Sequence, residues 1–235
     1  MSTEQKVAVI TGASQGIGAA LVKAYRDRNY RVVAISRSIE PSNDDVVAVS
    51  GDIADRKTAE RAIIEGVTRF GRIDTLINNA GIFIAKPFTE YTEADYAAYL
   101  GTNITGFFHI TQLAIAEMEK QGSGHVVQIS TSLVDNPITG VPSVLASLTK
   151  GGLNSATRSL AIEYAKRGIR VNAVALGTIK TPMHPVETHA QLDALHPIGH
   201  IGEISDAVDA ILYLESANFV TGEILHVDGG QSAGH

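Results

Sequence analysis

The sequence has no cysteine, no long apolar run and no excess of positive charge. The lack of cysteine excludes disulfides, thiolate chemistry and cysteine-based metal sites, and we predict no bound metal. No apolar stretch reaches the ~18–20 residues that span a bilayer, and the polar residues 1–6 are unlike a secretory signal. We therefore expect a cytoplasmic protein without a membrane partner. A formal net charge of −6 gives no general attraction for nucleic acid, and we predict none as a partner.

Short apolar runs alternate with longer amphipathic stretches along the 235 residues, which is the pattern of repeated βαβ units. The runs that we predict as strands are 7–10, 31–35, 46–49, 74–78, 126–129, 170–174 and 224–227. Apolar residues at helical spacing predict helices after residue 17, over 55–71, over much of 93–120 and over 143–166. Continuous apolar strands favour a parallel sheet covered by helices on both faces. With no linker or repeat, we predict a single α/β domain over 1–235.

The sequence TGASQGIG at 11–18 lies between the first predicted strand and the first predicted helix. A glycine-rich turn at a helix N-terminus offers N–H groups and a favourable dipole to a phosphate, and Gly12 and Gly16 permit positive φ angles. Three residues separate these two glycines, unlike the spacing G-x-G-x-x-G. A glycine turn without a ligand is the alternative. The residues that we expect to contact a dinucleotide here are Gly12, Ser14, Gln15, Gly16, Ile17 and Gly18.

This glycine spacing resembles that of the short-chain dehydrogenase/reductase family, and later motifs extend the resemblance over nearly the whole chain. These motifs are Asp52, NNAG at 78–81, Asn103 in GTNITG, Lys150 in TKGGLN, GTIKTP at 177–182 and VDGG at 227–230. The resemblance implies a Rossmann-type, doubly wound fold with seven parallel strands. It also implies dinucleotide contacts from Asp52, Ile53, Asn79, Ala80, Gly81, Lys150, Gly177, Ile179 and Thr181.

The end of the second predicted strand distinguishes the two nicotinamide cofactors. An acidic residue there binds the ribose hydroxyls of NAD and repels a 2′-phosphate. This sequence has Ser36 followed by Arg37, and a guanidinium pairs well with phosphate. We therefore predict NADP(H). The alternative is that Arg37 is a solvated surface residue, and Gln15 stands where NADP-preferring relatives often have a second basic residue.

The family resemblance implies hydride transfer between the nicotinamide and a carbonyl carbon, with a tyrosine four residues before the lysine as the proton donor. That position is Ala146, and no tyrosine occurs between Tyr99 and Tyr164. Residues four apart on a helix share a face, so Ala146 is expected beside Lys150 in the cavity. Alanine has no proton to give, and the loss of a general acid costs about 10²–10⁴ in rate.

Three side chains remain as candidates for the reaction. The resemblance assigns Lys150 to the cofactor ribose and Asn103 to a water near that lysine. Thr131 matches the family's substrate-binding serine, although Ser130 or Ser132 is an alternative. A further alternative is that all three hydroxyls only cap the backbone at a strand end. The stretch from Thr131 to position 146 is also longer than in the family.

The irregular segment 177–202 is predicted to be a substrate lid. Its apolar residues, such as Met183, Leu192 and Leu195, favour a small, largely apolar substrate. Four histidines lie in it, and an imidazole titrates near neutral pH. His184 is our first choice as a substitute proton donor, while the alternative for each histidine is a solvated surface position. No companion carboxylates suggest a metal.

Three hypotheses follow for the function. The first is an NADPH-dependent oxidoreductase that reduces a small carbonyl, C=N or C=C compound without the usual tyrosine. The second is a silent dinucleotide-binding sensor or assembly partner, and the third is an inactivated Tyr-to-Ala variant of an ordinary carbonyl reductase. The family is usually oligomeric, so we expect a homotetramer or dimer, paired through helices around 101–120 and 146–166, with Ala156, Ala161 and Ala165 allowing close contact.

Overall fold

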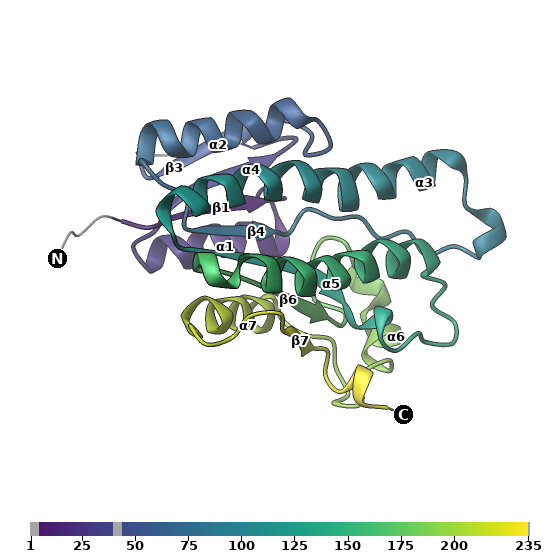
Figure 1. Ribbon diagram of the computed structural model, residues 1–235. Coiled ribbons are helices and arrows are strands. Elements are labelled where there is room, and N and C mark those ends of the chain that lie inside the picture. Colours follow the sequence, from purple (N-terminus) through teal and green to yellow (C-terminus); the bar gives the residue numbers. More distant parts are fainter. Residues whose placement is uncertain (1–4, 40–43, 235) are drawn as a thin grey trace.

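The computed structural model describes residues 5–39 and 44–234 and shows a seven-stranded parallel sheet with helices on both faces (Figure 1). The strands are β1 (Val7–Thr11), β2 (Arg31–Ser36), β3 (Val46–Ser50), β4 (Thr75–Asn78), β5 (Gly124–Thr131), β6 (Ile169–Leu176) and β7 (Ile224–Val227). Their order across the sheet is β3-β2-β1-β4-β5-β6-β7. This confirms the predicted Rossmann-type fold, with β5 and β6 longer at both ends than predicted.

The α-helices of the described residues are α1 (Gly16–Asp27), α2 (Arg56–Phe70), α3 (Glu93–Tyr99), α4 (Gly106–Gln121), α5 (Val144–Tyr164), α6 (His189–Asp193) and α7 (Ile204–Ser216). Within the part of the chain that the structure describes, no helix is long and apolar enough to cross a membrane. The short helix α6 lies inside the predicted lid, and α7 packs on the same face of the sheet as α1.

The stretch predicted as one helix over 93–120 differs from the prediction at its middle. A π-helical turn, Leu100–Thr105, separates α3 from α4. Such turns often occur at functional sites. This one carries Asn103, which is 1% exposed. Where this turn passes into α4, the backbone lies very close to the loop after β3, because a Cβ on Gly106 would lie 2.7 Å from the side chain of Ile53.

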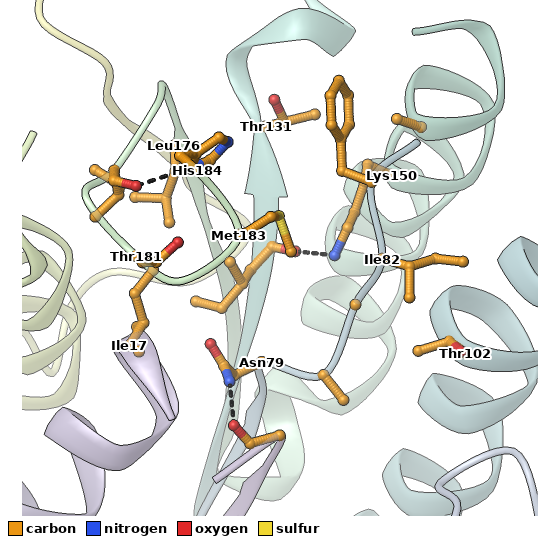
Figure 2. A pocket seen from close by; sticks show the side chains of 18 of the residues that line it. Ile17, Asn79, Ile82, Thr102, Thr131, Lys150, Leu176, Thr181, Met183 and His184 are labelled. Atoms are coloured by element: carbon orange, nitrogen blue, oxygen red, sulfur yellow. Dashed lines mark hydrogen bonds between the residues drawn. The ribbon is translucent and has the colours of Figure 1, made fainter. Parts of the chain in front are cut away.

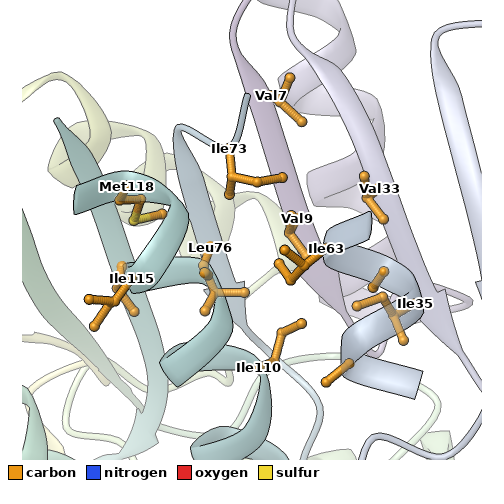
Figure 3. Close-up of a cluster of buried hydrophobic side chains, with 14 of the residues drawn as sticks. Val7, Val9, Val33, Ile35, Ile63, Ile73, Leu76, Ile110, Ile115 and Met118 are labelled. Atoms are coloured by element: carbon orange, nitrogen blue, oxygen red, sulfur yellow. The ribbon is translucent and has the colours of Figure 1, made fainter. Parts of the chain in front are cut away.

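Two apolar cores flank the sheet, and alternate residues of each inner strand point into opposite cores. In β1, Val7 and Val9 belong to the core under α2, α4 and α5, while Ala8 and Ile10 belong to the core under α1 and α7. Figure 3 shows the first core, where Ile110 of α4 faces the sheet. Burial on both faces explains why the strands read as continuous apolar runs.

The strand order places the carboxyl ends of β1 and β4 side by side at the centre of the sheet. The chain runs outward from β1 through β2 to β3, and then outward in the other direction from β4 to β7. In open α/β sheets, the loops at such a switch point diverge and leave a crevice where ligands bind. The topology therefore predicts a ligand site at this edge of the sheet.

Candidate active site

A cavity of about 410 Å³ lies along the carboxyl ends of the central strands, between the turn after β1 and the loop after β6 (Figure 2). Most residues predicted from the sequence line it. They are Gly12, Ser14, Gln15, Gly16, Ile17, Ser36, Arg37, Asp52, Ile53, Asn79, Ala80, Gly81, Thr131, Lys150, Gly177, Ile179 and Thr181. Two predicted residues, Gly18 and Asn103, do not line the cavity.

The turn between β1 and α1 has the geometry of a phosphate-binding loop. Gly12 and Gly16 have φ angles of +67° and +55°, which strain any residue with a Cβ. The N-cap residue of α1, Gln15, makes no side-chain capping hydrogen bond. The first N–H groups of this 12-residue helix are therefore available to an anion. Gly18 lies inside the turn, because its Cβ would be 2.1 Å from the carbonyl oxygen of Gly12, so it serves close packing rather than ligand contact.

The loop after β4 is held against this turn by hydrogen bonds. Asn79 Nδ2 donates to the carbonyl oxygens of Thr11 and Gly12 at 3.0 and 3.1 Å. Thr11 Oγ1 accepts from the backbone N–H groups of Asn79 and Ala80. Asn79 thus braces two crevice loops in addition to lining the cavity. Thr11, whose buried hydroxyl completes the brace, was not among the site residues predicted from the sequence.

The end of the cavity at β2 carries a hydroxyl and a guanidinium. Ser36 Oγ donates to Ser14 Oγ at 2.8 Å, which joins the strand end to the glycine turn. Arg37 is exposed at the cavity edge. Asp52 Oδ1 accepts from the N–H of Ala54 at 2.9 Å. This end of the cavity therefore offers a cation at the end of β2 and a carboxylate at the end of β3.

Lys150 lies at the opposite end of the cavity, on α5, and is 9% exposed. Its Nζ donates to the carbonyl oxygen of Ile129 at 2.6 Å. Burial lowers its pKa to about 8, because the interior disfavours the charged form. The lack of a side chain at Gly81 leaves space for this lysine, since a Cβ at that position would lie 3.1 Å from Lys150 Nζ and 3.4 Å from Asn103 Oδ1.

Asn103 lies behind Gly81 and holds the cavity wall. Its Oδ1 accepts from the N–H of Ile82 at 3.1 Å, and its Nδ2 donates to Thr149 Oγ1 at 3.1 Å. It therefore connects the π-helical turn, the loop after β4 and helix α5. Asn103 lies close to Lys150, because a Cβ on Gly81 would lie near both side chains. It is not itself among the residues that line the cavity.

Ala146 lines the cavity one helical turn before Lys150 and is 2% exposed. Apolar side chains surround this end of the cavity: Ile82, Phe83, Leu133, Ile138, Val141, Met183, Leu192 and Leu195. No tyrosine is among the described residues that line it. A compound held here would meet an apolar wall where Ala146 lies.

The three hydroxyls at the end of β5 have different surroundings. Thr131 lines the cavity, and its Oγ1 accepts from the N–H of Leu133. Ser130 also lines the cavity, and its Oγ makes no hydrogen bond within the described residues. Ser132 donates to Gln231 Oε1 at 2.9 Å and does not line the cavity. Thr131 and Ser130 remain candidates for a polar group of a substrate, and Ser132 does not.

The histidines of segment 177–202 differ in their hydrogen bonds and in whether they line the cavity. His196 is 4% exposed; its Nδ1 donates to the carbonyl of Leu192, and its Nε2 accepts from the N–H of Thr178. Both ring nitrogens are therefore committed to the fold. Neither His189 nor His200 is among the described cavity residues, whereas His184 is. Of these four histidines, His184 is therefore the one that lines the cavity in the part of the chain that the structure describes.

Some cavity residues were not predicted from the sequence. Gln231, Phe83, Ile138 and Leu176 all line it. Gln231 comes from the C-terminal segment and is fixed by Ser132, 99 residues earlier in the chain. Nothing in its local sequence marks such a contact, because only the folded chain brings the two together.

Comparisons with known proteins agree with this geometry. The family described as short chain dehydrogenase matches residues 6–191. An uncharacterized oxidoreductase of Thermotoga maritima is 32% identical over 99% of this chain and 100% of its own length. The structure of ElxO with NADP bound superposes with a TM-score of 0.92 at 30% identity, over 98% of this chain and 100% of that chain.

A second solved structure holds the other cofactor. The 3-ketoacyl-(acyl-carrier-protein) reductase from Brucella melitensis, complexed with NADH, has a TM-score of 0.90 at 28% identity. The match covers 98% of this chain and 100% of that chain. Solved structures similar to this chain therefore include one that holds NADP, which carries a 2′-phosphate, and one that holds NADH, which lacks the 2′-phosphate.

Proposed function

The chain belongs to the short-chain dehydrogenase family of oxidoreductases, and from this premise we propose that it reduces a small, largely apolar C=O, C=N or C=C compound with NADPH. In this proposal the reaction proceeds without the family's tyrosine acid. The cofactor lies along the cavity, from the glycine turn to Lys150, and the segment 177–202 acts as a lid. The whole described chain acts as one domain.

The buried Lys150 is the observation that carries the proposal. A buried lysine costs stability, and its Nζ has one hydrogen bond, to Ile129, among the described residues. Two of its three donor positions are therefore available to a ligand. Together with Gly81, which leaves the space for Nζ, this supports a site that binds hydroxyls of a cofactor ribose.

The preference for NADPH over NADH rests on the end of β2. Ser36 and Arg37 supply a hydroxyl and a guanidinium at the cavity, where an acidic residue would repel a 2′-phosphate. NADP(H) is the cofactor of ElxO, and NADH is the cofactor seen in the Brucella reductase. Arg37 is the residue that we expect to distinguish them, through a charge-assisted hydrogen bond to the phosphate.

The apolar walls and Ala146 support the assignment of the substrate. Removal of the phenol leaves space for a bulkier apolar group and takes away the proton donor fixed on α5. A C=C or C=N acceptor tolerates this better than a simple ketone, because its proton need not arrive from that position. Thr131 and Ser130 are then the groups that orient the polar end of the substrate.

The test is NADPH oxidation by the purified protein with ketones, enones, imines and quinones. We expect turnover of at least one class and its loss in Lys150→Met. The matched control is Lys166→Met, since Lys166 is exposed beyond the end of α5. Tight NADPH binding without turnover of any compound would favour the alternative, a silent dinucleotide sensor.

We also propose that the protein forms a homo-oligomer, either a dimer or a tetramer, through α4 and α5. Phe108, Leu148 and Ile162 expose 52%, 59% and 82% of their surface on these helices. Ala161, which was predicted for this interface, is instead buried in the subunit's own core. Light scattering at micromolar concentration would reject this assembly if it reported a monomer.

A cytoplasmic location of the protein stays a prediction.

A further inference from the structure

We propose that His184 is the acid that protonates the reduced substrate, in place of a tyrosine on α5. This inference rests on the proposed reductase function and adds to it a catalytic residue on the lid. The proton then arrives from the loop after β6, where His184 lines the cavity (Figure 2), rather than from α5.

Few described groups in the cavity carry an ionisable proton. They are Arg37, Asp52, Lys150 and His184. Arg37 and Asp52 follow β2 and β3, at the far end of the cavity from Ala146. Lys150 is tied to Ile129 and assigned to the cofactor. His184 follows Met183 of the apolar lining in the loop after β6, and it has no role in binding the cofactor in this proposal.

The hydrogen bond to Ile179 fixes which nitrogen of His184 exchanges its proton. His184 Nδ1 lies 2.9 Å from the carbonyl oxygen of Ile179. A carbonyl only accepts, so Nδ1 carries a hydrogen in both the neutral and the cationic ring. The exchangeable proton is therefore on Nε2, for which no hydrogen bond occurs within the described residues. This is the arrangement of an oriented acid–base histidine.

Three hydrogen bonds hold His184, two on its backbone and one on its ring. Its N–H donates to the carbonyl of Thr181 at 2.9 Å. Its own carbonyl accepts from His189 Nε2 at 3.0 Å. With the bond from Nδ1 to Ile179, these contacts fix the ring in the wall of the cavity, which Leu176, Met183 and Thr131 also line (Figure 2). His189 on α6 is a titratable group in contact with His184, and Lys150 on α5 lines the same cavity.

The proposed step balances atoms and charge. A carbon of the substrate double bond receives hydride from NADPH, and the π electron pair moves to the oxygen, nitrogen or second carbon. That atom forms a bond to the proton of His184 Nε2, which leaves a neutral imidazole and NADP⁺. His184 is partly exposed, so the ring takes its next proton from water.

Three variants test the proposal: His184→Gln, His184→Ala and the control His200→Gln, whose residue is exposed and outside the cavity. We expect kcat to fall about 10²–10⁴-fold in both His184 variants, with NADPH affinity by calorimetry unchanged within twofold. Added imidazole should restore activity to His184→Ala. The kcat of the parent should fall as pH rises, because the acid loses its proton, and His184→Gln should lose that dependence.

A measurement on the resting protein supplies a readout that does not depend on turnover. Nitrogen-15 NMR of the side chains should show His184 with its hydrogen on Nδ1 when neutral. The opposite tautomer would overturn the proposal. Full kcat and an unchanged pH profile in His184→Gln would also overturn it, while leaving the reductase function standing. A parent that reduces no compound of the panel would overturn both.

Discussion

The replacement Lys150→Met separates the lysine's functional role from its effect on folding. The side chain is 9% exposed, and burial lowers its pKa from 10.5 to about 8. The native state therefore holds this proton less tightly than the unfolded chain does. The protonated lysine destabilises the fold below about pH 8, and this cost shrinks as pH rises from about 8 toward 10.5. Methionine has a similar length and carries no charge.

The magnitude follows from the two pKa values. At 1.36 kcal/mol for each tenfold change, the charged lysine costs about 3 kcal/mol at pH 7 and about 1 kcal/mol at pH 10. The variant also loses the hydrogen bond to Ile129, worth about 1.5–3 kcal/mol from the charged lysine at pH 7 and about 1 kcal/mol from the neutral lysine at pH 10. We therefore expect the apo variant to be more stable than the parent by about 1 kcal/mol at pH 7 and by nearly nothing at pH 10.

The same replacement should weaken NADPH binding. A hydrogen bond from a charged group contributes about 1.5–3 kcal/mol, so the dissociation constant should rise roughly 10–100-fold. Urea unfolding of the apo protein at the two pH values and calorimetry with NADPH measure both effects, with Lys166→Met as the control. A variant that is less stable at pH 7 and binds NADPH as well as the parent would refute the reasoning.

Three further predictions concern the cofactor, the cavity and the fold. Arg37→Ala should narrow the preference for NADPH over NADH by about 1–3 kcal/mol in calorimetry, and equal affinities in the parent would contradict the assignment. Ala146→Tyr should overfill the cavity at a cost of about 1–3 kcal/mol and lower native activity; a tenfold gain on simple ketones with no loss elsewhere would instead indicate an inactivated ordinary reductase. Burial raises the pKa of Glu215, but hydrogen bonds from His125, Tyr30 and Thr75 outweigh it and lower the pKa from 4.5 to about 2. Glu215→Gln should therefore cost about 3 kcal/mol at pH 7 and progressively less as pH falls from about 4.5 toward 2, and equal losses at pH 7 and pH 3 in urea unfolding would contradict this.

The fold was predictable from the sequence because its signals are local. Each inner strand is buried on both faces, so its apolar residues are continuous and mark it without any alignment. The glycine turn at 11–18 is equally local, since Gly12 and Gly16 need positive φ angles. The π-helical turn at Leu100–Thr105 was not predicted, because its apolar residues keep a spacing close to that of an α-helix.

The candidate site was predictable in part. The residues of the glycine turn and Asn79 come from motifs that directly follow strands, and the parallel sheet brings such positions to one edge. Lys150 comes instead from a motif inside helix α5. The sequence favoured His184 among the histidines of the lid only by its place at the start of that segment, since solvation and burial, which decide between them, depend on the folded chain. His196 is committed on both nitrogens, and His184 on one. Gln231 depends on a contact across the fold.

The central claim is that this chain transfers hydride from NADPH to a substrate in a cavity where Ala146 takes the place of the usual acid. Its most direct test is a single-turnover reaction with NADPH deuterated at nicotinamide C4, followed by mass spectrometry of the products. We expect one deuterium bound to carbon in the reduced product, and a slower reaction than with unlabelled NADPH. Bound NADPH that passes no deuterium to any ketone, enone, imine or quinone would contradict it.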